Sequence, residues 1–160
     1  MKTYTIHVNS SESIASTALG VDKTYNFDFG IMPEGEYELT FTFQGQLEKL
    51  TTADGLLETY PTKIFCRLPF IQNKYEVTQE GVAGSSHLLG LLEPKDGLVG
   101  SSAVMRSLVA GAGHNAPTYL YGKPQGSTFN VIFANANAIQ GSPNPVPTFY
   151  DLVLNFKHLC

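Results

Sequence analysis

The side chains that could bind a metal are spread thinly along the chain. Its four histidines, His7, His87, His114 and His158, each fall in a different predicted element, and no two have the spacing of a ligand pair. A metal site needs three or four convergent ligands, which metal-binding β proteins bring from neighbouring strands as a compact set of His and Glu. The sequence has no such set, so we predict no metal and no cofactor.

Residues for acid–base or nucleophilic catalysis are equally poorly placed. Glu34, Glu36 and Glu38 form an acidic row that could supply the carboxylate pair of a glycosidase. However, Glu36 and Glu38 alternate with the apolar Tyr37 and Leu39, as is typical of the solvent-facing side of a strand. The serines lack the Gly-x-Ser-x-Gly turn of a hydrolase, and the Gly-Ala-Gly run at 111–113 precedes His-Asn-Ala-Pro rather than a helix. We therefore predict a protein that is not an enzyme.

Binding is the remaining route, and two long loops could provide it. The segments Gly111–Pro117 and Asn135–Pro147 are low in charge and rich in Gly, Pro and Asn. Loops longer than about 12 residues are usually functional or disordered. In a β-sandwich they gather at the ends of the sheets, where they can contact neighbouring subunits or sugars. Plain flexible connections are the alternative interpretation.

Composition limits the class of protein. The 160 residues fit one domain, 1–160, and the charged fraction is only 15%, with a net charge of −4. The chain has no basic run for nucleic acid, no apolar run of about 20 residues for a membrane span, and no signal-peptide pattern. Cys66 lies in an apolar strand and Cys160 is the last residue, which favours free thiols over a disulfide. We expect a soluble protein made in a reducing compartment.

The stretch Tyr37–Phe43 has the clearest structural pattern. Tyr37, Leu39, Phe41 and Phe43 alternate with Glu and Thr after a Pro-Glu-Gly turn, which predicts a strand with one buried face. Similar patterns predict further strands at 3–8, 23–29, 62–68, 74–78, 86–92, 103–109, 118–121, 129–133 and 149–158. Residues 9–18 are predicted as a loop, and 47–60 as a long loop with one helical turn. The pattern predicts an all-β fold, a single jelly-roll β-sandwich of two antiparallel sheets; an immunoglobulin-like sandwich is the second choice.

Three stretches carry a family resemblance: Phe29–Phe43, Asn115–Phe133 with its Asn-x-Pro and Gly-x-Pro, and the closing strand Tyr150–Phe156. Together they resemble the small single-jelly-roll capsid proteins of eukaryotic double-stranded DNA viruses, among them giant viruses and their smaller relatives. Members of that family form pentameric pentons at the fivefold vertices, or serve as minor capsid proteins beneath the major capsid shell. The resemblance implies a virion protein, assembled in the host cytoplasm or nucleus, that contacts copies of itself and the major capsid protein.

The expected function is therefore a penton subunit that forms a homopentamer. The low charge agrees with this role because weakly charged surfaces are less costly to desolvate at a subunit contact. The residues expected at these contacts lie in three loops: His114, Asn115, Pro117, Pro124, Gln125, Pro143, Asn144 and Pro145. Two alternatives stay open, a minor capsid protein beneath the major shell and a lectin-like carbohydrate-binding β-sandwich.

Overall fold

The computed structural model describes residues 2–16, 22–48, 50–51, 58–59, 64–72, 74–77, 83–94, 105–110, 115–135 and 147–159. Within these ranges the protein is all-β, as predicted. The only helical elements there are two short 3₁₀ turns, η1 (Ser10–Glu12) and η2 (Phe29–Ile31). A capping side chain opens each turn, since Asn9 accepts from the Ser11 amide and Asp28 from the Gly30 amide.

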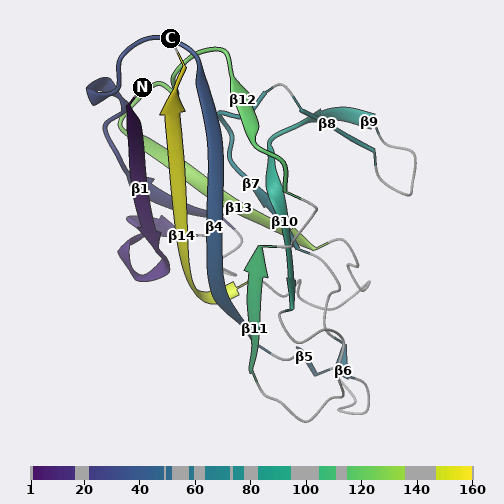
Figure 1. Ribbon diagram of the computed structural model, residues 1–160. Helices are drawn as coiled ribbons and strands as arrows, with labels where there is room; N and C mark the ends of the chain where they lie inside the picture. The colour runs from purple at the N-terminus through teal and green to yellow at the C-terminus, as the bar shows by residue number, and fades with distance from the viewer. Residues whose placement is uncertain are drawn as a thin grey trace.

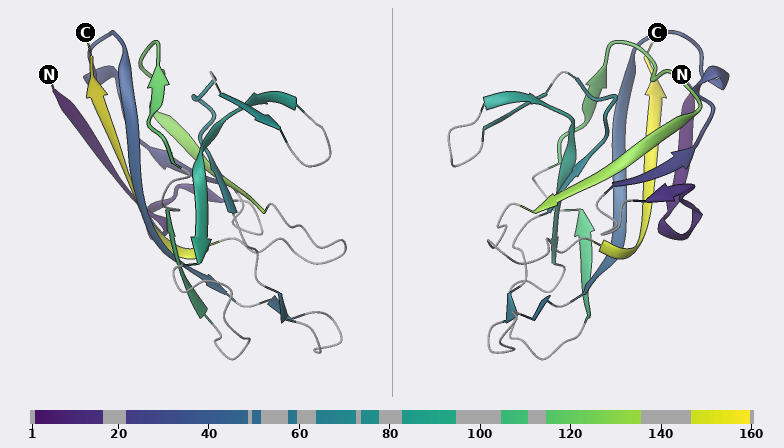
Figure 2. Two further views of the ribbon diagram at one scale, coloured as in Figure 1. Left: turned by 45° about the vertical axis from the view of Figure 1, so that its right-hand side comes forward. Right: turned by 180° about the vertical axis from the view of Figure 1, so that it is seen from behind.

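The main feature is a ten-stranded antiparallel sheet that curls on itself (Figures 1 and 2). From one edge to the other its strands are β1 (Thr3–Asn9), β14 (Pro147–His158), β4 (Tyr37–Glu48), β11 (Met105–Ala110), β10 (Leu88–Pro94), β7 (Ile64–Arg67), β13 (Thr128–Asn135), β3 (Asp22–Asn26) and β2 (Ala15–Ser16). The tenth, β12 (Thr118–Leu120), pairs with the first residues of β4. Two hairpins stand apart, β5 (Leu50–Thr51) with β6 (Glu58–Thr59), and β8 (Lys74–Val77) with β9 (Ala83–Ser86). The sequence predicts two sheets; the pairing of β10 with β11 joins the strands into one.

The hydrophobic core lies inside the curl, where β14 and β4 face β13. Leu152, Leu154 and Phe156 of β14 are fully buried, as the alternation in the sequence predicts. Their face meets β13 through aromatic rings: Phe133 lies 5.1 Å from Tyr150 of β14 and 6.1 Å from Phe43 of β4. Edge-to-face rings at this separation contribute beyond the area they bury. The aromatic residues that are frequent in the sequence therefore form the contact between the two sides of the curl.

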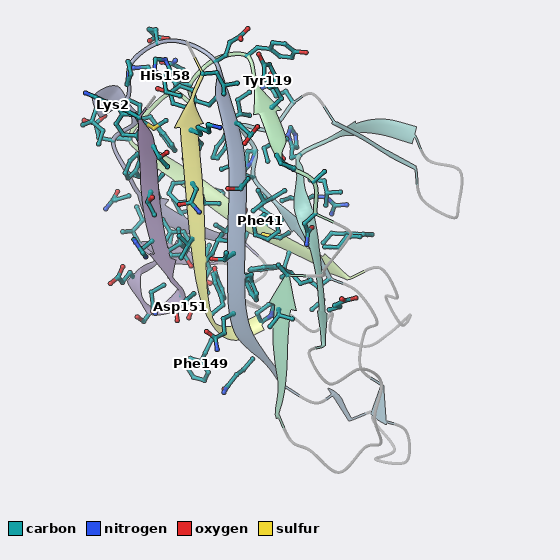
Figure 3. The ribbon with its side chains drawn as sticks, in the orientation of Figure 1. Lys2, Phe41, Tyr119, Phe149, Asp151 and His158 are labelled. Atoms are coloured by element: carbon teal, nitrogen blue, oxygen red, sulfur yellow. The ribbon has the colours of Figure 1, made fainter. Side chains whose placement is uncertain are left out.

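Strand β4 pairs with β14, β11 and β12, and its burial follows the predicted alternation with one difference. Tyr37, Leu39 and Phe43 are buried, whereas Phe41 is only half-buried. Phe41 lies in the middle of the strand (Figure 3), at the point where β4 passes from β12 to β11. It packs against the core from its margin, and a Cβ at Gly90 on β10 would lie only 2.5 Å from its ring.

Several predicted boundaries are wrong. The strand predicted at 23–29 ends at Asn26, because the Phe27 and Phe29 amides donate to backbone oxygens of the 126–127 turn instead of continuing the ladder. The predicted loop 9–18 contains η1 and the short strand β2. Residues 47–60 were predicted as a long loop with one helical turn, but the described residues there are strand, since β4 continues to Glu48 and β5 and β6 follow. Backbone pairing decides these boundaries: β2 pairs with β3, β5 with β6, and the end of β4 with β11 and β14, whereas the Asn9 cap sets the start of η1.

Candidate functional site

The predicted subunit-contact residues that the structure describes lie on the two sides of β12. Asn115 and Pro117 lie just before β12, and Pro124 and Gln125 lie just after it. The other predicted contact residues, His114, Pro143, Asn144 and Pro145, are outside the described residues. Of the four that are described, Pro117 and Gln125 are exposed, Asn115 is half-buried and Pro124 is buried.

The Asn115 side chain is hydrogen-bonded to the backbone of β10 in its own chain. Its Oδ1 accepts from the Leu91 amide at 2.8 Å, and its Nδ2 donates to the Leu91 carbonyl at 3.0 Å. The side-chain amide therefore makes the two bonds that a neighbouring strand would make with β10. Gly90 makes room for it, because a Cβ at this position would lie 2.2 Å from Asn115 Oδ1 and 2.5 Å from the Phe41 ring.

Pro124 and Gln125 line a surface depression that we call the tyrosine groove. It has a volume of about 390 Å³ and is lined by Phe70, Gln72 and residues 119–125. Tyr121 is 73% exposed and Tyr119 is 38% exposed, with their rings edge-to-face at 5.0 Å. Because Tyr combines a large apolar ring with a polar end, exposed pairs of this kind are typical of binding surfaces.

Polar contacts fix the tyrosine groove to the neighbouring turn at residues 33–36. Lys123 donates to the Met32 carbonyl at 2.9 Å and forms a 3.3 Å ion pair with Glu34. Tyr119 donates its hydroxyl to the Glu36 carboxylate. These contacts on both sides of Tyr121 hold the loop in place, so the groove is largely preformed.

The turn at 33–36 is in turn held by β4 and β14. Tyr37 is buried and donates its hydroxyl to the Pro33 carbonyl at 2.6 Å. His158 lies with its ring 4.9 Å from that of Tyr37, and its Nε2 is 3.2 Å from the Glu34 carbonyl oxygen. Within the acidic row of the sequence, the Glu34 and Glu36 carboxylates join this turn to Lys123 and Tyr119.

A second depression, which we call the polar groove, lies at the opposite end of β14 and β4 (Figure 3). It has a volume of about 540 Å³ and is lined by residues 9–11, 44–46 and 149–151. Phe149 is 62% exposed there, beside an Asn9 side chain that donates to Asp151 Oδ1 at 2.6 Å. The groove thus combines one exposed aromatic ring with amide, hydroxyl and carboxylate groups.

The remaining candidates for chemistry are dispersed. His7 is exposed on β1, and His87 bonds through Nδ1 to the Ile71 carbonyl. In the part of the chain that the structure describes, no three His, Cys, Asp or Glu side chains are placed to hold a metal ion. Burial raises the pKa of the Cys66 thiol to about 12, so this residue stays protonated at neutral pH.

Sequence reasoning missed the exposed aromatic residues Tyr119, Tyr121 and Phe149. Their position relative to the buried residues gives a signal that could have found them. Thr118 and Leu120 are buried, so the tyrosines beside them must lie on the outer face, and Phe149 likewise precedes the buried Tyr150. An aromatic residue at an outward position of a strand pattern is therefore a candidate contact residue.

Comparison with known proteins does not place the chain in a family. No protein-family model matches it, and no curated protein matches it. The described residues also hold no helix with the length and apolarity that a membrane span would need.

Proposed function

We propose that the protein is a single-jelly-roll capsid subunit that forms rings of five at the fivefold vertices of an icosahedral DNA virus. The observation that carries the proposal is the order in which the strands pair. The sequence resemblance described above and the exposed tyrosine groove add to it.

The pairing order supports a jelly roll because the main strands pair as the two arms of one long hairpin. β1 pairs with β14, β3 with β13, β4 with β11, and β7 with β10, so the outermost strands in the sequence meet and the pairs converge on the middle. The hairpin then curls, so that β14 also pairs with β4 and β13 with β7. In a jelly roll, a curled hairpin of this kind forms two facing sheets. We assign β1-β14-β4-β11 to one of them and β3-β13-β7-β10 to the other, with the β10–β11 pairing as the junction that joins them into one sheet here. Viral capsid domains are a frequent use of this architecture, although the fold alone does not fix function.

The tyrosine groove is the surface that suits a contact between subunits. Interfaces are enriched in Tyr and depleted in charge, and a few aromatic residues often dominate the binding energy. Tyr121 is such an anchor, and the predicted contact residue Gln125 lies exposed in the same groove. A contact between this groove and a different face of the next copy is heterologous, and such contacts close into a ring when the rotation fits.

Native mass spectrometry on the purified protein tests the ring. We expect five copies of the 17.4 kDa chain, and loss of the ring on Tyr121→Ser. Phe149→Ser is the matched control, because it removes another exposed aromatic ring at the other end of the molecule. A wild-type protein that stays monomeric at high concentration would argue against the penton, and a particle map with the subunit beneath the major shell would favour the minor capsid alternative.

The polar groove favours a second candidate function, binding of a carbohydrate. Sugars are bound by an aromatic ring that covers their apolar face and by amide and carboxylate groups that bond to their hydroxyls. Phe149, Asn9 and Asp151 offer these groups together. A glycan-array signal that Phe149→Ala abolishes and Tyr121→Ser leaves intact would support this function.

A further inference from the structure

The first strand of the sheet has one open side. β1 pairs with β14 through all seven residues from Thr3 to Asn9, and no described strand lies along its other side. Thr3, Thr5 and His7 are exposed, whereas Ile6 and Val8 are buried in the core. The strand is therefore firmly seated in the fold and at the same time forms an edge of the sheet (Figure 1).

The register identifies which backbone groups face outward. The His158 amide donates to the Lys2 carbonyl, so residues 2 and 158 form a hydrogen-bonded pair of the antiparallel ladder. Hydrogen-bonded pairs recur at every second residue, which places the Tyr4, Ile6 and Val8 backbone groups toward β14. The N–H and C=O groups of the alternate residues, Thr3, Thr5 and His7, consequently point away from the sheet.

This edge lacks the features that normally prevent pairing between molecules. Proteins protect edge strands by making them very short, by placing Lys, Pro or an inward charge on them, or by inserting a bulge. At the other end of the sheet β2 has only two residues, so that edge is short. β1 has seven residues, none of them Lys, Arg, Asp, Glu or Pro, and its register with β14 has no shift.

We propose that β1 is a pairing edge for the β1 strand of a second copy, joined antiparallel about a two-fold axis. The strand is complementary to itself because polar and apolar residues alternate along it, as Thr, Tyr, Thr, Ile, His, Val and Asn. Its outward backbone groups belong to the polar residues Thr, His and Asn. Pairing them places polar residues opposite polar ones and apolar opposite apolar, with no like charges facing each other. The contact adds a strand pair across two molecules and is separate from the tyrosine groove, so it links rings or dimerises the free subunit.

Hydrogen exchange measures the pairing directly. In the wild-type protein at high concentration, the amides of Thr3, Thr5 and His7 should be protected and should become fast on dilution. The Tyr4, Ile6 and Val8 amides should stay protected throughout, because β14 holds them. Amides of Thr3, Thr5 and His7 that exchange fast at every concentration would overturn the proposal.

A charge at the edge provides the matched mutational test. Thr5→Lys places a lysine on the open edge, and Thr42→Lys adds the same charge to an exposed position of the interior strand β4. Both are made in Tyr121→Ser protein, so that the proposed ring does not contribute to the mass. We expect Thr5→Lys to weaken dimerisation at least about tenfold, and Thr42→Lys to leave it unchanged. Thr5→Pro removes an outward N–H and no backbone bond to β14, so it should act like Thr5→Lys. Both variants also remove the Thr5 hydroxyl that donates to Asn155 Oδ1 of β14.

The outcomes separate this proposal from the ring. A dimer that persists in Thr5→Lys and Thr5→Pro, or a Tyr121→Ser protein that stays monomeric at high concentration, refutes pairing through β1. A wild-type protein that forms the β1 dimer but no ring of five refutes only the penton.

Discussion

Replacing Gly90 with Ala should destabilise the protein strongly, although the change adds only one methyl group. The new Cβ would lie 2.2 Å from Asn115 Oδ1 and 2.5 Å from the Phe41 ring, closer than real contacts allow. Moving Asn115 would break its two bonds to Leu91, worth about 1 kcal/mol each, and moving the ring adds an overpacking cost of about 1–3 kcal/mol. The sum is about 3–5 kcal/mol, or roughly 6–20 °C in Tm for a chain of this size.

A double-mutant cycle isolates the Asn115 contribution. Asn115→Ala alone should cost about 2 kcal/mol, because it removes two hydrogen bonds from the Leu91 backbone. In the double variant the clash with Oδ1 is gone, and only the contact with Phe41 remains. The double variant should therefore be more stable than the sum of the single changes predicts, by about 2 kcal/mol, because the two bonds to Leu91 are lost only once.

Urea denaturation followed by fluorescence or circular dichroism measures all three variants. Gly122→Ala is the matched control, since no atom lies within 4 Å of a Cβ at that position, and its stability should stay within about 0.5 kcal/mol of wild type. Gly90→Ala at wild-type stability, or costs that simply add in the double variant, would refute the contact between Asn115 and β10.

Three further changes test the core and the end of the sheet. Tyr37→Phe removes the bond to the Pro33 carbonyl and should cost about 1 kcal/mol by urea denaturation. Phe41→Asp places a charge at the margin of the core and should cost about 3 kcal/mol or more, whereas Thr42→Asp on the exposed face should be nearly neutral; equal solubility of the two would contradict the face assignment. The pKa of Cys66 is raised to about 12, so its contribution to stability is complete below about pH 8.5 and is lost as the pH rises toward 12. Cys66→Ala should flatten this fall between pH 9 and 11, and an unchanged slope would refute it.

Individual strands could be predicted well from the sequence, because the alternation of apolar and polar residues along a strand indicates which of its faces is buried. In β14 every second residue from Leu152 to Phe156 is apolar, and those residues are the buried ones. In β1 the exposed Thr3, Thr5 and His7 alternate with buried or half-buried residues in the same way. Where one face of a strand is dry and the other wet, the period of two is enough to assign both faces.

The sequence could not predict what depends on pairs of distant residues. Asn115 bonds to Leu91, 24 positions away, and nothing near either residue indicates the partner. Residues 47–48 were predicted as part of a loop but continue β4, because β11 and β14 both pair with that end of the strand. The candidate surfaces were missed for a different reason. Tyr121 and Phe149 lie beside buried residues, which the alternation could have indicated, but the alternation does not show which distant residues lie around them to form a groove.

The three surfaces lie on different parts of the molecule, and their arrangement bears on function. Tyr119 of the tyrosine groove and Phe149 of the polar groove lie at opposite ends of the β4–β14 pair, and β1 runs along its side (Figure 3). A subunit that uses one end or side for copies of itself therefore leaves the other end open for a different ligand. Capsid assembly and carbohydrate binding are compatible on this geometry, so a positive glycan result would not exclude the ring. Single changes at Tyr121, Phe149 and Thr5 affect one surface each. Whether each change removes the ring, glycan binding or the β1 dimer therefore decides between the functions.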